Sequence, residues 1–243
     1  MSYRIFLAGA TGVIGRRLAP LLLDAGHAVV GTTRSEAKAE ELRALHIEPV
    51  VVDVFDAQAL MHAVVSTRPQ VVIHQLTDLT GILDPQRRAA ALVRNARIRE
   101  EGTHNLLRAA IAAGARRWVV QSIAWMYAPG GEPHSEQHPL DFGADGARAI
   151  TVRGIAALEK WALESPPLEG LVLRYGQFYG PGTGSDIPQG AVPVHVDAAA
   201  HAALLAIDRG EQGIYNIAEP NEQVATEKAR RELGWQPDFR LSI

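Results

Sequence analysis

The feature that most constrains this sequence is a glycine-rich turn near its N-terminus. An apolar run at residues 5–7 leads into Gly9-Ala10-Thr11-Gly12-Val13-Ile14-Gly15, and a helical pattern begins near Val13. Glycines at this spacing between a strand and a helix permit a tight turn, a close approach of the backbone to a pyrophosphate and close helix–sheet packing. We expect the free amides at the helix start to bind the phosphates of a dinucleotide. The alternative is a turn that only starts a helix. The predicted contacts are Gly9, Thr11, Gly12, Val13, Ile14 and Gly15.

Strand-like apolar runs alternate with helical stretches along the rest of the chain, which is typical of βαβ units. The expected strands are residues 5–7, 28–32, 49–52, 71–75, 118–122, 171–175 and 213–217. The expected helices are residues 13–25, 36–45, 57–66, 85–113, 151–163, 196–209 and 225–233. The pattern predicts an α/β fold, a Rossmann-type doubly wound parallel sheet. Residues 1–176 would form the dinucleotide-binding core and residues 177–243 a small C-terminal α/β lobe, in one compact unit. The Gly/Pro-rich segments 128–146 and 180–193 are expected to be loops that shape a substrate pocket.

Composition excludes several classes of function. The 243 residues carry a formal net charge of -3 without a basic stripe, which argues against nucleic acid as a partner. The absence of cysteine removes disulfides, thiolate metal sites and cysteine nucleophiles. No apolar run reaches the roughly 18 residues of a membrane span, and no signal peptide pattern is present, so we expect a cytoplasmic protein. His134, Glu136 and His138 lie in a loop that we expect to be solvated, so no metal site is predicted.

The end of the second strand indicates which dinucleotide is bound. A protein that binds NAD places an acidic residue there to hold the adenosine ribose. Here the segment reads Thr33-Arg34-Ser35, without a carboxylate. A guanidinium suits a 2′-phosphate, so Arg34 predicts NADP(H) rather than NAD(H), with Arg16 or Arg17 as further contacts. The alternative is a solvated arginine without a role in binding.

Asp53 ends the third expected strand, with Val54 beside it. The Asp53 carboxylate could accept a hydrogen bond from the amino group of the adenine, and Val54 would lie beside the adenine ring. The alternative for Asp53 is an N-cap of the next helix. His74, in an apolar strand, is expected to be a core histidine whose hydrogen bonds are satisfied.

Further motifs extend over nearly the whole chain. They are the segments Glu101–Leu107, Leu173–Gly182, His195–Asp197, Gly213–Ile217 and Leu233–Pro237. With the glycine turn, they resemble the extended or atypical branch of the short-chain dehydrogenase/reductase superfamily, the NAD-dependent epimerase/dehydratase family. The resemblance implies a small-molecule substrate and a homodimer formed through the helix 85–113. It also implies cofactor contacts at Gln75, Leu76, Thr77, Gln121, Tyr175 and Phe178.

The catalytic pattern of that family is missing here. The family uses a tyrosine, a lysine four residues later and a serine from strand five, so that the lysine's charge lowers the pKa of the phenol. No tyrosine in this chain has a lysine at that spacing, and alignment of the helix places Thr151, Ile155 and Ile123 at the three positions. The remaining catalytic candidates are Ser122, Tyr127 and Tyr175, and the alternative for each is ordinary packing.

Three hypotheses for the function follow. The first is an NADP(H)-dependent oxidoreductase that acts on a small carbonyl or alcohol by a different proton route. The second is a catalytically silent NADP(H)-binding sensor or scaffold. The third is a sugar-nucleotide epimerase, which is disfavoured because only a short loop separates Tyr179 from His195.

Overall fold

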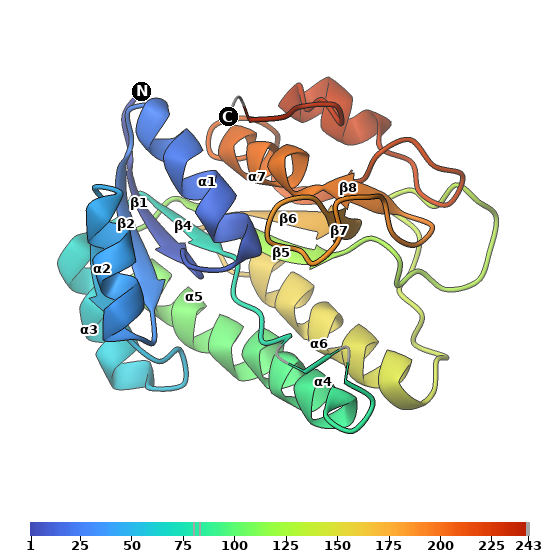
Figure 1. The fold of residues 1–243 in the computed structure, drawn as a ribbon, viewed down its shortest axis with the longest axis horizontal. Helices are drawn as coiled ribbons and strands as arrows, with labels where there is room; N and C mark the ends of the chain where they lie inside the picture. The colour runs from blue at the N-terminus through green and yellow to red at the C-terminus, as the bar shows by residue number, and fades with distance from the viewer. Residues whose placement is uncertain (80, 83, 242–243) are drawn as a thin grey trace.

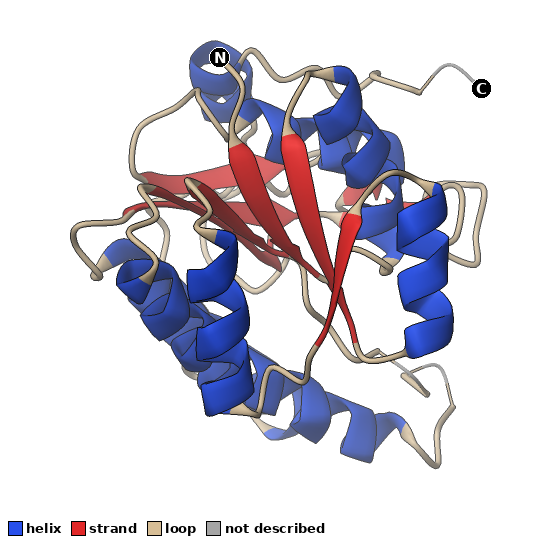
Figure 2. Ribbon diagram, turned by 90° about the vertical axis from the view of Figure 1, so that its left-hand side faces the viewer, coloured by secondary structure: helices blue, strands red, loops and turns tan. Residues whose placement is uncertain are grey.

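The computed structural model, which describes residues 1–79, 81–82 and 84–241, contains a seven-stranded sheet covered by helices on both faces (Figures 1 and 2). The strand order is β3-β2-β1-β4-β5-β6-β9, and every pairing within it is parallel. This arrangement confirms the predicted doubly wound fold. The strands are β1 (Arg4–Ala8), β2 (Ala28–Thr33), β3 (Glu48–Val51), β4 (Val71–His74), β5 (Arg117–Ile123), β6 (Glu169–Tyr175) and β9 (Gly213–Ile217).

Two apolar layers hold the helices onto the sheet. Successive side chains of a strand point to opposite faces, so Ile73 packs in one layer and Val72 in the other. The first layer contains α1 (Val13–Asp24), α2 (Glu36–Ala44) and α7 (Val196–Leu205). The second contains α3 (Ala57–Thr67), α5 (Thr103–Ala112) and α6 (Gly146–Leu163). Burial on both faces explains why β4 reads as a continuous apolar run.

The long helix predicted for residues 85–113 is present in a modified form. It comprises α4 (Arg88–Arg97), a π-helical turn η1 (Ile98–Gly102) and α5. A Cβ at Gly102 would lie 3.1 Å from Val54 Cγ1, so this glycine lets the helix approach the segment after β3. Pairing of this helix with a second copy stays a prediction.

Several predicted boundaries were wrong. The helix predicted to start at Thr151 begins at Gly146, because Asp145 has the extended backbone of an N-cap position. Two short strands, β7 (Gln177–Tyr179) and β8 (Pro193–His195), were missed and pair with each other on either side of the 180–193 loop. The helix predicted for 225–233 is helical only from residue 227 and includes the π-helical turn η2 (Ala229–Leu233).

The predicted C-terminal lobe is in contact with the core. β9 pairs with β6 in the main sheet, and α7 packs beside α1 (Figure 1). The division of the chain at residue 176 therefore stays a prediction, and residues 242–243 lie outside the described residues. Among the described helices, none is both long and apolar enough to cross a membrane.

Candidate functional site

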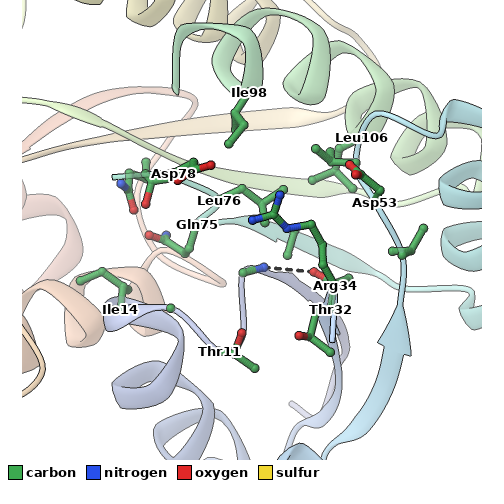
Figure 3. Close-up of a pocket in the computed structure, with 18 of the residues that line it drawn as sticks. Thr11, Ile14, Thr32, Arg34, Asp53, Gln75, Leu76, Asp78, Ile98 and Leu106 are labelled. Carbon is green, nitrogen blue, oxygen red and sulfur yellow. Dashed lines mark hydrogen bonds between the residues drawn. The ribbon is translucent and has the colours of Figure 1, made fainter. Parts of the chain in front are cut away.

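A cavity of about 690 Å³ lies at the carboxyl edge of the sheet (Figure 3). β1 and β4 are adjacent there although β2 and β3 separate them in sequence, so this edge is the topological switch point where open α/β sheets bind ligands. The cavity wall includes residues from the glycine turn, the β2 tip, the segments after β3 and β4, the long helix and β5. Most of the predicted cofactor contacts line it, namely Gly9, Thr11, Gly12, Val13, Ile14, Arg34, Asp53, Val54, Gln75, Leu76, Thr77, Gln121 and Phe178.

The glycine turn has the geometry that a pyrophosphate requires. Gly9 has a φ of +90°, which favours glycine, and a Cβ there would lie 2.8 Å from the Gln75 carbonyl oxygen. Gly12 is the N-cap of α1 and no side chain caps the helix, so the first amides of α1 lack intrahelical partners. Gly15 does not line the cavity; it packs closely against the backbone of Gly9 and Ala10. The free amides at this helix terminus fit a bound phosphate, and their role in cofactor binding stays a prediction.

Two cations lie at the β2 end of the cavity. Arg34 forms no hydrogen bond or ion pair with the residues that the structure describes, and its side chain extends into the cavity (Figure 3). Lys38, one turn into α2, lines the same wall and was not singled out in the sequence. The signal for Lys38 in the sequence was its position in the first turn of the helix that follows the β2 tip. Ser35, the N-cap residue of α2, makes no side-chain cap.

The other predicted cations point elsewhere. Arg16 Nη2 lies 2.8 Å from Glu41 Oε2, and Arg17 Nε lies 2.5 Å from the buried Asp197 Oδ1. Both guanidiniums are therefore paired with carboxylates and neither residue lines the cavity, so a contact of either with the same phosphate as Arg34 stays a prediction.

Asp53 lines the cavity and is not the N-cap of α3. Its Oδ1 accepts a hydrogen bond from Phe55 N at 2.9 Å, whereas Asp56 caps α3 through Ala59 N. The N-cap alternative for Asp53 was therefore wrong by three residues. Its other carboxylate oxygen has no hydrogen bond with a described residue, which leaves an acceptor near the cavity.

The three candidate catalytic residues lie outside the cavity wall. Ser122 Oγ donates to Glu159 Oε1 at 2.6 Å, and Tyr127 Oη donates to Asn216 Oδ1 at 2.7 Å. Burial raises the pKa of Tyr127, with Arg174 opposing that shift. Both hydroxyl groups are thus neutral and held by other protein groups.

Tyr175 is buried next to the cavity. Its hydroxyl accepts a hydrogen bond of 3.4 Å from Gln75 Nε2, and burial raises its pKa well above the usual range. The phenol therefore stays neutral at physiological pH.

The three positions that correspond to the family's catalytic residues carry side chains that are apolar or bonded within their own helix. Ile155 and Ile123 belong to one apolar cluster with Leu140 and Val152. Thr151 Oγ1 donates back to Ala147 O of its own helix at 3.2 Å. This arrangement supplies no ionisable group to a reacting atom.

Two histidines that the sequence singled out, His74 and His134, lie outside the cavity wall. His74 accepts from Leu76 N at 3.1 Å and lies 2.9 Å from Thr103 Oγ1, while burial lowers its pKa to about 3. It is the satisfied core histidine that was predicted. His134 is buried and stacks on Tyr127, so the expectation of a solvated loop was wrong at that residue. Among the described residues, no group of three potential ligands is placed to hold a metal ion.

Comparison with known proteins agrees with the fold. A model of the NAD dependent epimerase/dehydratase family matches residues 5–213. The chain belongs to this family. Among curated members, the 3-diazoavenalumate denitrifying reductase of a Streptomyces species is 40% identical over 99% of this chain and 81% of that enzyme. The UDP-N-acetyl-alpha-D-glucosaminuronate decarboxylase of Bacillus cytotoxicus is 26% identical over 82% of this chain and 62% of that enzyme.

Solved structures of the epimerase/dehydratase type have the same fold as this family member. The dTDP-glucose 4,6-dehydratase of Streptomyces venezuelae, solved with NAD, has a TM-score of 0.78 and 19% identity, covering 98% of this chain and 92% of that one. The UDP-glucose 4-epimerase of Thermotoga maritima has a TM-score of 0.74 and 20% identity, covering 98% of this chain and 94% of that one. At these identities the likeness extends to the fold alone. Family membership and the reductase relative together support an NAD(P)-dependent oxidoreductase.

Proposed function

We propose that the chain is an NADP(H)-dependent reductase that transfers a hydride to a small, strongly electrophilic acceptor. The observation that supports the proposal is a cavity lined by the uncapped start of α1 and by two cations, Arg34 and Lys38, with no proton-transferring side chain at the family's catalytic positions. The bound dihydronicotinamide would supply the hydride. Arg34 and Lys38 would hold the 2′-phosphate through charge-assisted contacts.

The missing proton donor restricts which acceptors fit. Reduction of a carbonyl leaves an alkoxide, which needs a proton from a positioned acid. Thr151, Ile155 and Ile123 offer none, and the Tyr127 hydroxyl is hydrogen-bonded to Asn216. The site therefore suits an acceptor whose reduction consumes no proton better than it suits a carbonyl.

A diazonium group meets that requirement. When a hydride adds to the terminal nitrogen of an arenediazonium, the carbon–nitrogen bond breaks, dinitrogen leaves, and hydrogen takes its place on the ring carbon. The electron pair and the hydrogen both come from the hydride, so the cationic arene diazonium and NADPH give the arene, dinitrogen and NADP⁺ with no further proton. The relative at 40% identity is named for a denitrifying reduction of a diazo compound, which supports this class of acceptor for this chain.

The test is oxidation of NADPH with an arenediazonium that carries ¹⁵N in the diazo group. We expect one labelled dinitrogen per NADPH oxidised, measured by mass spectrometry of the headspace, and much slower oxidation with aldehydes and ketones. Gly12→Asp is the control, because its carboxylate would repel the pyrophosphate. A carbonyl reduced faster than the diazonium would contradict this acceptor class. Conversion of a nucleotide sugar without net oxidation would favour the epimerase.

A catalytically silent sensor is the second candidate. It is favoured by the same apolar positions, because a protein that only binds NADP(H) needs no acid or base. Tight binding of NADPH without oxidation by either class of acceptor would support the sensor over the reductase.

A further inference from the structure

Gln75, the residue that follows β4, carries a buried hydrogen-bond acceptor without a partner. The residue is 5% exposed, and its Oε1 forms no hydrogen bond within residues 1–79, 81–82 and 84–241. A buried acceptor without a partner destabilises the folded protein unless a donor satisfies it. Gln75 lines the cavity, and its side chain points toward Ile14 (Figure 3). The acceptor is therefore placed for a donor that arrives with a ligand.

The nitrogen of the amide has a partner within the protein. Gln75 Nε2 donates to the Tyr175 hydroxyl at 3.4 Å, and Tyr175 is 1% exposed. The contact orients the amide so that Nε2 faces Tyr175, and Oε1 keeps no hydrogen-bond partner among the described residues. Gln75 thus differs from a surface glutamine, whose amide turns freely in water.

The position along the cavity indicates which part of a dinucleotide would lie there. The glycine turn separates Gln75 from Arg34, which lies at the opposite, adenosine end. Phe178, whose ring lies 5.4 Å from that of Tyr175, lines the cavity together with Gln121. A dinucleotide with its pyrophosphate at the start of α1 and its adenosine beside Arg34 would extend its nicotinamide half toward Gln75, Gln121 and Phe178.

We propose that Gln75 is a positioning residue whose Oε1 accepts a hydrogen bond from the carboxamide N–H of the nicotinamide. This inference rests on the proposed binding of NADP(H). The contact fixes the rotation of the ring about its bond to the ribose, and so determines which face of the ring is turned toward the acceptor. Ribose hydroxyls are the other donors in that half of the cofactor, and the test separates them from the carboxamide.

The test compares two ligands by calorimetry, NADP⁺ and its 3-acetylpyridine analogue, in which a methyl ketone replaces the carboxamide. The native protein should bind NADP⁺ about tenfold more tightly, the value of one hydrogen bond to a buried acceptor. Gln75→Met keeps the length of the side chain without its polar atoms. We expect it to bind the analogue as the native protein does and to lose the preference for NADP⁺.

Gln189→Met is the matched control, because Gln189 is exposed in the 180–193 loop and bonds to Ser185. Tyr175→Phe, which frees the amide to rotate, is the second variant and should reduce the preference even if Gln75→Met does not fold. An equal loss of affinity for both ligands would assign Gln75 to a ribose hydroxyl and overturn the proposal, as would an unchanged preference in the variants. A native protein that binds neither ligand would instead contradict the proposed function.

Discussion

Ser122 Oγ donates a hydrogen bond to Glu159 Oε1 at 2.6 Å, and both residues are buried. Ser122 follows Gln121 on β5, so its side chain points to the other face of the sheet, away from the cavity that Gln121 lines. The serine that sequence reasoning placed near the reacting atoms is thus part of a structural network. Arg174 completes that network by binding Glu159 through Nε at 2.8 Å and Nη2 at 2.6 Å.

Replacing Ser122 by alanine should affect stability and not catalysis. Loss of a hydrogen bond to a buried carboxylate is expected to lower the free energy of unfolding by about 1.5–3 kcal/mol. The rate of hydride transfer should match that of the native protein. Urea unfolding and single-turnover oxidation of NADPH measure the two quantities. A large loss of the hydride-transfer rate in a folded Ser122→Ala protein would contradict this prediction and indicate a catalytic role for Ser122.

Glu159→Ala should be far more harmful than Ser122→Ala. The carboxylate faces Arg174 and also stabilises the charge of the buried Arg99, whose pKa burial lowers to about 10. Without it, two buried guanidiniums lose their compensating charge, and we expect a loss of about 3–5 kcal/mol. Urea unfolding of Glu159→Ala measures this loss, and a double-mutant cycle of Glu159→Ala with Arg174→Met measures the coupling. A coupling energy near zero would show that the pair does not stabilise the fold.

The sequence predicted the elements that local rules specify. The spacing of Gly9, Gly12 and Gly15 fixes the turn, and the strand ends place Gln75 and Gln121 at one edge. The pairing of Ser122 with Glu159 joins residues 37 positions apart, and no spacing rule selects it. Asp145 lies in a Gly/Pro-rich segment whose composition predicts a loop, although it is the N-cap residue of α6.

The acid sensitivity of the fold should depend in part on His74. Burial lowers its pKa from 6.5 to about 3, so between these values the unfolded chain binds a proton that the folded chain does not. The stability that neutral His74 provides is complete above pH 6.5 and is lost as the pH falls toward 3, at up to about 1.4 kcal/mol per pH unit. His74→Gln should reduce the slope of unfolding free energy between pH 4.5 and 6.5. An identical slope in both proteins would contradict the assignment.

Lys38→Gln should weaken the binding of NADPH without affecting the binding of NADH. Its ammonium lines the cavity beside Arg34 but is exposed, so we expect a loss of roughly two- to fivefold in NADPH affinity. Lys160→Gln is the control, because Lys160 is exposed on α6 outside the cavity wall. Fluorescence titration gives both affinities. An equal change for NADPH and NADH would place Lys38 away from the 2′-phosphate.

The identity of the cofactor is tested most directly by calorimetric titration of the native protein and Arg34→Asp with NADPH and NADH. Arg116→Asp serves as the control, since Arg116 is exposed just before β5, at the opposite edge of the sheet. The native protein and the control should bind NADPH at least about tenfold more tightly than NADH, the range expected for a charge-assisted phosphate contact, and Arg34→Asp should abolish or reverse that preference. Equal affinity of the native protein for both dinucleotides, or no binding of either, would contradict the account.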